Sequence, residues 1–98
     1  MEENLSIEWS EAAVYHLEKF YNFILYKWSF KEAEKFLDQI QEFEIVVSKF
    51  PKAFIQSTKK KKYRIGLIQQ HVSAIYEIQK RKIIIVALID NRAQPKFR

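Results

Sequence analysis

The spacing of apolar residues changes at Pro51, and this change constrains the fold more than any other feature of the chain. Before Pro51, apolar side chains recur every three or four residues, which is the period of an amphipathic helix. After it they alternate with a period of two, which is typical of half-buried strands. Because proline disfavours helix at the residue before it, the helical half is predicted to end there.

Two helices are predicted in the first half. Ser10 and Ser29 are natural N-cap residues, and each stands before an apolar stripe with helical spacing. The first stripe is Ala13, Leu17, Phe20, Ile24 and Trp28, and the second is Ala33, Phe36 or Leu37, Ile40, Phe43 and Val47. Ahead of the first helix, apolar and polar residues alternate over 5–9, which predicts a short N-terminal strand.

The second half predicts three strands that form an antiparallel meander. They cover 63–68, 72–78 and 83–89, and short polar connections stand at 69–70 and 80–82. The last strand is apolar at every position. A strand of this kind is either central and covered on both faces, or it has an apolar face that a binding partner covers.

Together these elements predict an α+β fold: an N-terminal strand, a two-helix hairpin and a three-stranded antiparallel meander, with the helices packed on one face of the sheet. A chain of 98 residues suffices for one modest core, so 1–98 is predicted to be a single domain with a basic tail at 92–98. The other face of the sheet is expected to meet solvent, a ligand or a partner. The residues expected to line it are Arg64, Ser73, Ile75 and Glu77.

Positive charge is concentrated in the second half. Residues 1–50 contain five Lys or Arg and ten Asp or Glu, whereas residues 51–98 contain twelve Lys or Arg and only Glu77 and Asp90. Four lysines, 59–62, directly precede Tyr63. A basic half of this kind is typical of a protein that binds a polyanion or an acidic partner, although a lysine run is also common in a solvated loop.

The residue inventory excludes several classes of chemistry. The chain has no cysteine, no glycine-rich phosphate loop and no nucleophile elbow. His16 and His71 are the only histidines, so no metal and no cofactor is expected, and His71 is interpreted as a structural residue rather than a general base. The longest apolar run, 83–89, is far shorter than the roughly 20 residues of a membrane span. The N-terminus does not resemble a signal peptide, so a cytoplasmic protein without membrane contact is expected.

Six short segments occur in the order that a known family has them. They are IEWSEAA (7–13), KWS (27–29), SKFP (48–51), YR (63–64), IYEI (75–78) and LIDNRAQP (88–95). Together they resemble the RelE/ParE superfamily of toxins from bacterial type II toxin–antitoxin modules, which are also called plasmid stabilisation modules. The resemblance covers nearly the whole chain. The ending, Asp90-Asn91-Arg92 followed by Pro95, resembles the ParE-like branch.

The resemblance implies a growth-inhibiting toxin held inactive by a cognate antitoxin, whose extended or helical segment lies over the sheet and a groove. The antitoxin would meet the basic half and the apolar strand 83–89, by strand addition or by a helix in a groove. On the ParE-like side the toxin acts by binding a protein target such as DNA gyrase and is not itself an enzyme. The residues implied in binding the antitoxin or the target are Arg64, Ser73, Ile75, Glu77, Asp90 and Arg92.

The alternative is a RelE-like endoribonuclease that cleaves mRNA on the ribosome. The resemblance would then make Lys60, Lys62, Arg64 and Arg92 the catalytic candidates. Cations of this kind bind phosphates and stabilise charge in the transition state. That branch also uses a C-terminal Tyr or His, whereas Phe97 is the only aromatic residue after Arg92. Sequence-specific binding of DNA is not expected, because the predicted sheet lacks a recognition helix.

Overall fold

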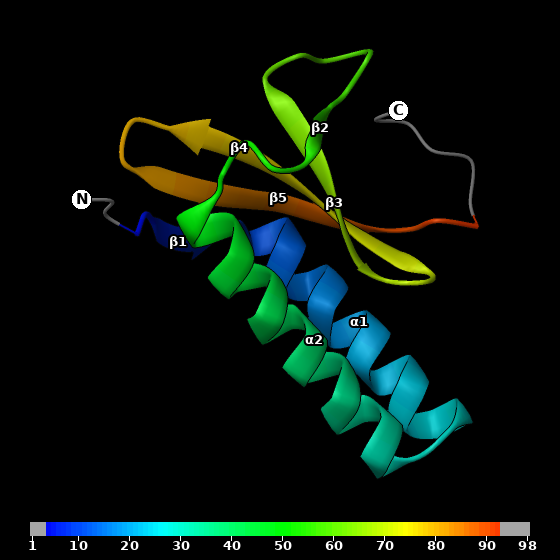
Figure 1. The fold of residues 1–98 in the computed structure, drawn as a ribbon. Helices are drawn as coiled ribbons and strands as arrows, with labels where there is room; N and C mark the ends of the chain where they lie inside the picture. The colour runs from blue at the N-terminus through cyan, green and yellow to red at the C-terminus, as the bar shows by residue number, and fades with distance from the viewer. Residues whose placement is uncertain (1–3, 93–98) are drawn as a thin grey trace.

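Two antiparallel helices lie against one face of a five-stranded sheet (Figure 1). A computed structural model describes residues 4–92, so 93–98 of the predicted basic tail lie outside the described residues. The elements are β1 (Ser6–Trp9), α1 (Glu11–Lys27), α2 (Phe30–Lys49), β2 (Ile55–Gln56), β3 (Tyr63–Gln69), β4 (Val72–Gln79) and β5 (Lys82–Asp90). Neither helix of this described part is long and apolar enough to cross a membrane.

The predicted fold class is confirmed, and the strand count differs. The sheet has the order β1-β5-β4-β3-β2, in which β3, β4 and β5 form the predicted antiparallel meander. The N-terminal strand β1 joins the same sheet by pairing in parallel with β5. An additional strand, β2, pairs with β3. It has only two residues, which is too short for an alternating pattern.

β5 is an interior strand of the sheet, so its continuous apolar run reflects burial. Its first residues pair with β1 on one side and with β4 on the other. Ile83, Ile85 and Leu88 are buried in the main core beneath the helices. On the opposite face, Ala87 packs with Ile75 in a smaller cluster. A partner strand therefore cannot pair with β5 at residues 82–85, because both edges of β5 are already paired there.

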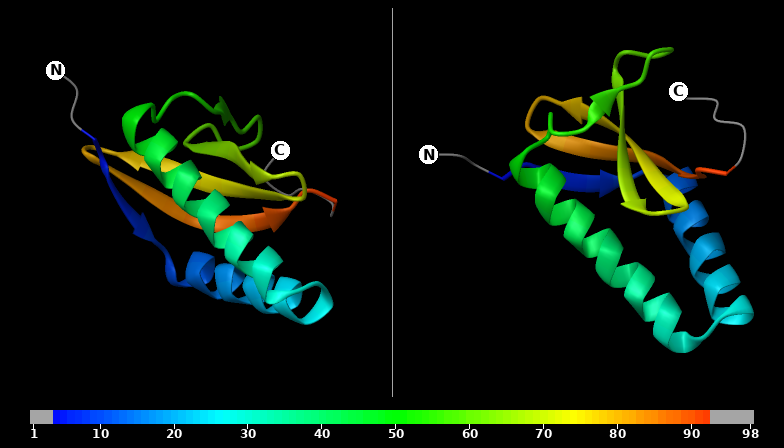
Figure 2. Two further views of the ribbon diagram at one scale, coloured as in Figure 1. Left: turned by 60° about the horizontal axis from the view of Figure 1, so that its bottom comes forward. Right: turned by 45° about the vertical axis from the view of Figure 1, so that its right-hand side comes forward.

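Both predicted helix caps are present. The Ser10 hydroxyl accepts a hydrogen bond from the Ala13 backbone N–H (3.0 Å) and donates one to the Val86 carbonyl (2.8 Å), so one side chain begins α1 and ties it to β5. The Ser29 hydroxyl accepts from the Glu32 N–H (3.1 Å). The α2 stripe is buried as predicted. In α1 the stripe fails at Trp28, which is 71% exposed, because the helical hairpin projects beyond the sheet (Figure 2).

Close packing of α2 on the sheet depends on Gly66. A Cβ atom at this position would lie 2.5 Å from Cε1 of Phe43 and 3.1 Å from Cγ of Phe54. The Phe43 ring occupies this space and also packs edge-on against Tyr76, with centroids 6.0 Å apart. Opposite Gly66 on β4 stands Ala74, another small residue. The sheet face that carries these two small residues is therefore the one that α2 covers.

Candidate functional site

A groove of about 700 Å³ lies between α1 and the end of the sheet where β5 finishes. Its floor is apolar and consists of residues from the helix and from the two central strands: Phe20, Ile24, Val72 and Leu88. Aromatic side chains of α1 and its C-cap continue the groove outward: Tyr15, Phe23 and Trp28. These three are largely exposed, which is unusual for a contiguous aromatic surface that has no partner.

The rim of this groove is cationic. Lys19, Lys27 and Arg92 line it together with His16 and His71. Among the described residues that line the groove, Asp90 is the only carboxylate, and Arg92 binds it. An apolar floor within a positive rim suits a segment that presents apolar side chains on one face and carboxylates beside them.

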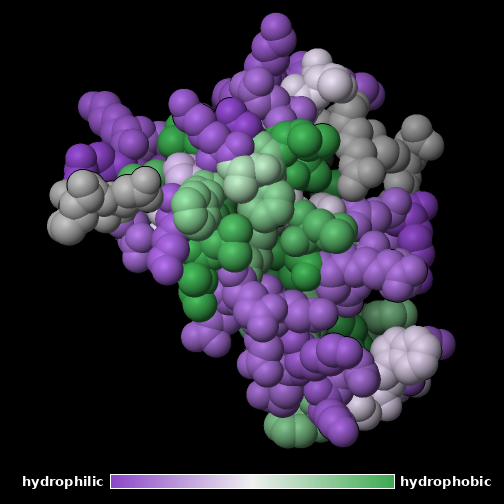
Figure 3. Space-filling model, viewed as in Figure 1, coloured by the Kyte–Doolittle hydropathy of each residue, from purple (hydrophilic) through white to green (hydrophobic). Residues whose placement is uncertain are grey.

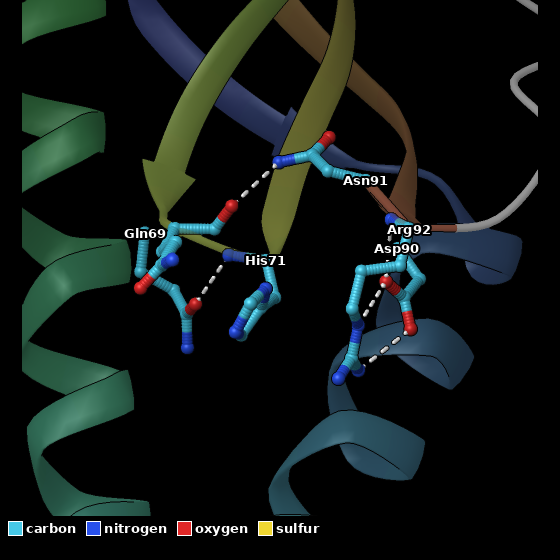
Figure 4. A network of polar contacts seen from close by, with 6 residues as sticks. Gln69, His71, Asp90, Asn91 and Arg92 are labelled. Atoms are coloured by element: carbon cyan, nitrogen blue, oxygen red, sulfur yellow. Dashed lines mark hydrogen bonds and ion pairs between the residues drawn. The ribbon is translucent and has the colours of Figure 1, made fainter.

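Arg92 and Asp90 form a bidentate ion pair at the end of β5 (Figure 4). Nε of Arg92 lies 3.0 Å from Oδ1 of Asp90, and Nη2 lies 3.0 Å from Oδ2. The guanidinium hydrogen bonds hold the pKa of the Asp90 carboxyl below its usual range, and the carboxylate in turn raises the pKa of Arg92. The pair therefore stays charged at neutral pH and fixes the direction of the guanidinium.

The turn before β4 is connected to the same end of β5. The His71 backbone N–H donates to Oε1 of Gln69 (2.7 Å), and the Asn91 backbone N–H donates to the His71 carbonyl (2.7 Å). In Figure 4 the imidazole of His71 and the guanidinium of Arg92 extend from the strands on the same side, towards the helices. Hydrogen bonds between neighbouring strand ends thus place both side chains at the groove.

His16 forms a hydrogen bond with the edge of β5 beside the groove, where no strand of the described residues pairs with that edge. Its Nδ1 accepts a hydrogen bond from the Leu88 backbone N–H (3.2 Å), beyond the point where the pairing with β1 stops. An accepting Nδ1 places the ring proton on Nε2. With Ser10 bound to the Val86 carbonyl, side chains of α1 and its cap replace the missing neighbour strand.

Arg64 does not lie on the face predicted for it. It stands opposite Tyr76, on the helix side of the sheet, and its Nη1 donates to the Phe54 carbonyl (2.7 Å). Ser73 stands opposite Leu67, on the other side. The sequence shows the alternation within each strand but not the register between them, so the prediction that Arg64 shares a face with Ser73, Ile75 and Glu77 is wrong.

The other face of β4 is less open than predicted. Ser73 and Ile75 are 1% and 0% exposed, and Ile75 packs with Ile65 and Ala87. Glu77 is half-buried. Of the residues expected to bind a partner, Asp90 and Arg92 are the two that the structure places together at an accessible groove.

The four catalytic candidates are not gathered at one place. Lys60 and Lys62 are exposed in the loop before β3, and Arg64 lies near the start of that strand. Arg92 follows the far end of β5. Because Tyr63 pairs with Glu77 and Asp90 pairs with Val72, the two ends are separated by five residues of β4, about 16 Å at 3.3 Å per residue.

The α1 side of the groove was not predicted. Tyr15, Lys19, Phe23 and Lys27 follow one another at four-residue spacing, and Tyr15 and Phe23 are 56% and 50% exposed. An alternation of aromatic and cationic residues at this spacing, beside a buried stripe, is the signal that points to an exposed binding face on a helix.

Tyr76 provides a prediction for stability at high pH. Its ring is buried, and its hydroxyl donates to the Pro51 carbonyl (2.6 Å). Burial raises the pKa of Tyr76 to about 12, although the Arg64 guanidinium opposes this shift. Between pH 10 and 12 the unfolded state has lost a proton that the folded state retains. Raising the pH in this window therefore lowers the free energy of unfolding, by at most about 1.4 kcal/mol per pH unit for one group.

Urea denaturation of the wild type and of Tyr76→Phe, each at pH 9.0 to 11.5, measures this effect. Every other titratable group is common to the two proteins, so the difference between them reports on Tyr76. We expect the wild type to lose stability more steeply with pH than the variant, because phenylalanine has no proton to retain. Equal slopes in the two proteins would show that the folded Tyr76 ionises as readily as the unfolded one.

Comparisons with known proteins agree with this fold. A family model described as the ParE toxin of the type II toxin–antitoxin system parDE matches residues 7–95. A chain of the chromosomal ParDE toxin–antitoxin system from P. aeruginosa has a TM-score of 0.74 at 17% identity, over 88% of this chain and 95% of that one. A chain of the E. coli DinJ-YafQ toxin–antitoxin complex has a TM-score of 0.60 at 9% identity, over 92% and 96%.

A conserved hypothetical protein from Helicobacter pylori is also similar, with a TM-score of 0.58 at 14% identity over 90% of this chain and 96% of that one. No curated protein matches the sequence. At these identities the solved structures show that the fold is shared, and they carry no assignment of individual residues.

Proposed function

Because the chain belongs to the ParE toxin family of type II toxin–antitoxin systems, we propose that a cognate antitoxin neutralises it by placing an acidic, amphipathic segment in the groove beside α1. The single observation that carries this proposal is the combination of an apolar floor with a cationic rim. The match to the family model over 7–95 further supports one toxin domain over 1–98, acting in the cytoplasm beside its antitoxin.

Docking of a helix or of side chains suits this groove better than strand addition. On the edge of β5 that borders the groove, the Leu88 N–H already donates to His16, and the Val86 carbonyl already accepts from Ser10. A new strand would have to displace both contacts. A helix that lies across the floor leaves them in place and buries the Phe23 ring.

The proposed toxic action is binding to a protein target such as DNA gyrase, without catalysis by this chain. Two features support it. Arg92 lies at the opposite end of the sheet from the Lys60 loop, and the Asp90 carboxylate partly neutralises its charge. Arg64, another of the four candidates, donates a hydrogen bond to the Phe54 carbonyl. Charge stabilisation of a cleaved phosphate requires such groups to converge on one point.

Gyrase inhibition tests this proposal. The purified chain is added to gyrase and relaxed plasmid, and we expect ATP-dependent supercoiling to stop at near-stoichiometric toxin. Prior addition of the protein encoded in the neighbouring reading frame should restore it. Supercoiling that continues in a stoichiometric excess of a toxin that arrests growth would contradict the gyrase target.

The exposed Lys60 and Lys62 favour a second candidate, a ribosome-dependent endoribonuclease. Toeprinting on translating ribosomes decides between the two activities. A new mRNA cut in the ribosomal A site that disappears with Lys60→Ala and Lys62→Ala would establish the nuclease. No cut, together with inhibited supercoiling, would leave gyrase as the target.

A further inference from the structure

Two basic loops lie at the end of the sheet that is away from the groove. One is the loop that carries Lys59–Lys62 into β3, and the other is the tight turn from β4 into β5 at Lys80-Arg81. The strand register places them at the same end, because Tyr63 pairs with Glu77 and Gln79 pairs with Lys82. In Figure 3 hydrophilic residues follow the upper margin of the molecule over both loops.

The lysine loop has a defined shape. The buried Ser57 hydroxyl accepts hydrogen bonds from the backbone N–H groups of Lys59 and Lys60 (3.2 Å each). The Tyr63 N–H donates to the Lys60 carbonyl (2.9 Å), and the Gln56 side chain donates to the Lys61 carbonyl (3.0 Å). These bonds hold the backbone while the lysine side chains remain exposed. The loop therefore presents its charge from a preorganised turn rather than from a flexible tail.

Few carboxylates neutralise this charge. Within residues 4–92, no carboxylate lies at ion-pair distance from Lys59–Lys62. Glu8 pairs with Lys82 (3.3 Å) in an exposed contact. Lys80 is held in the left-handed region at φ 46°, where Asn or Gly would be less strained. A cation thus occupies a turn position where another residue type would fold more favourably.

We propose that these two loops bind the phosphate backbone of double-stranded DNA, independently of base sequence. Exposed lysines with few acidic neighbours are the groups that replace counterions on a duplex. Unlike the groove, the lysine loop offers flexible point charges rather than a pocket for apolar anchors, so an acidic peptide suits it less well. Single strands need aromatic rings for base stacking, whereas the Tyr63 ring packs on the sheet beneath Lys62.

This surface goes beyond the proposed function and does not depend on it. The groove and the lysine loop lie at opposite ends of the strands, so a segment bound in the groove leaves the lysines accessible. DNA binding is measured directly, without growth or gyrase activity. A negative result in either assay therefore leaves the other interpretable.

Fluorescence anisotropy with a labelled 20-base-pair duplex of arbitrary sequence tests the proposal. When Lys59–Lys61 and the two cations of the β4–β5 turn each contact a phosphate, the logarithm of the DNA binding constant should fall linearly with the logarithm of the salt concentration. The expected slope is about −5. Replacing all four lysines, 59–62, by glutamine should change the slope to about −2 and weaken binding about 100-fold at 50 mM salt. A duplex of unrelated sequence should bind equally well.

Two further variants make the result specific. Lys80→Asn removes a cation at a position that tolerates asparagine, so it should weaken binding about fivefold without lowering the melting temperature. Lys19→Gln with Lys27→Gln removes two groove lysines and should leave DNA binding nearly unchanged. Equal affinity of the quadruple variant and the wild type would overturn the proposal. So would stronger competition by polyglutamate of matched charge than by unlabelled duplex.

Discussion

Gly66→Ala should lower the free energy of unfolding by about 2 kcal/mol and the melting temperature by about 8–16 °C. The added Cβ would lie 2.5 Å from Cε1 of Phe43, a distance that requires the ring or the strand to move. Phe43 cannot move freely, because it packs on both Phe54 and Tyr76. The loss arises from overpacking, since this glycine does not need a positive φ. Thermal and urea denaturation followed by circular dichroism measure it.

A double-mutant cycle tests the cause. Phe43→Leu shortens the side chain that the new methyl group meets, so the double variant should be more stable than the sum of the two single changes predicts, by about 1 kcal/mol. Leu67→Ala, at the next residue of the same strand, is the matched control. This leucine is 59% exposed, so its loss should cost about 0.5 kcal/mol or less. Additive effects in the cycle would show that the glycine matters for another reason.

Phe23→Glu should weaken antitoxin binding by about 100-fold, which is about 2.7 kcal/mol. The change removes an aromatic ring from the groove and places a carboxylate beside a floor that we propose receives an acidic segment. Because Phe23 is half-exposed and glutamate favours helix, the toxin itself should keep its fold. Isothermal titration calorimetry with the neighbouring gene's product measures the affinity.

Tyr26→Glu is the matched control for this substitution. Tyr26 is an aromatic residue of the same helix, is 88% exposed and does not line the groove. It should leave the affinity within about twofold of the wild type, because it loses no contact with the bound segment. If Tyr26→Glu weakens binding as much as Phe23→Glu, the antitoxin occupies a different face of α1.

Much of the fold follows from local chemistry and was therefore predictable. Ser10 and Ser29 cap helices because a hydroxyl can satisfy a free N–H at a helix start, and this is a property of a few neighbouring residues. Pairing between distant strands is not such a property. Nothing near β1 indicates that it joins β5 in parallel. The two-residue β2 is too short to alternate.

The site was less predictable because it depends on register. In β5 the register shift leaves Val86 as an extra residue, and in β3 a similar shift leaves Ile68. Each changes which side chains share a face beyond the shift. Arg64 was misplaced because a period-two pattern gives no register between β3 and β4, in which Arg64 pairs with Tyr76. Asp90 and Arg92 were identified from a short motif, and they do lie together. The α1 side of the groove was missed because Tyr15 and Phe23 stand beside a stripe that predicts only core, and because Phe20 and Trp28 were assigned to that core.

The order of the strands has a consequence for when the groove can form during synthesis. Among the described strands β5 comes after the others in the chain, and both β1 and β4 pair with it. The Ser10 hydroxyl must find the Val86 carbonyl across 76 residues, a contact with a high loop-closure cost. A nascent chain whose β5 is still inside the ribosome lacks the strand that joins β1 to β4, and it lacks one wall of the groove. The groove can therefore form only after the ribosome has released β5, so an antitoxin already present in the cell can meet the groove as soon as it forms.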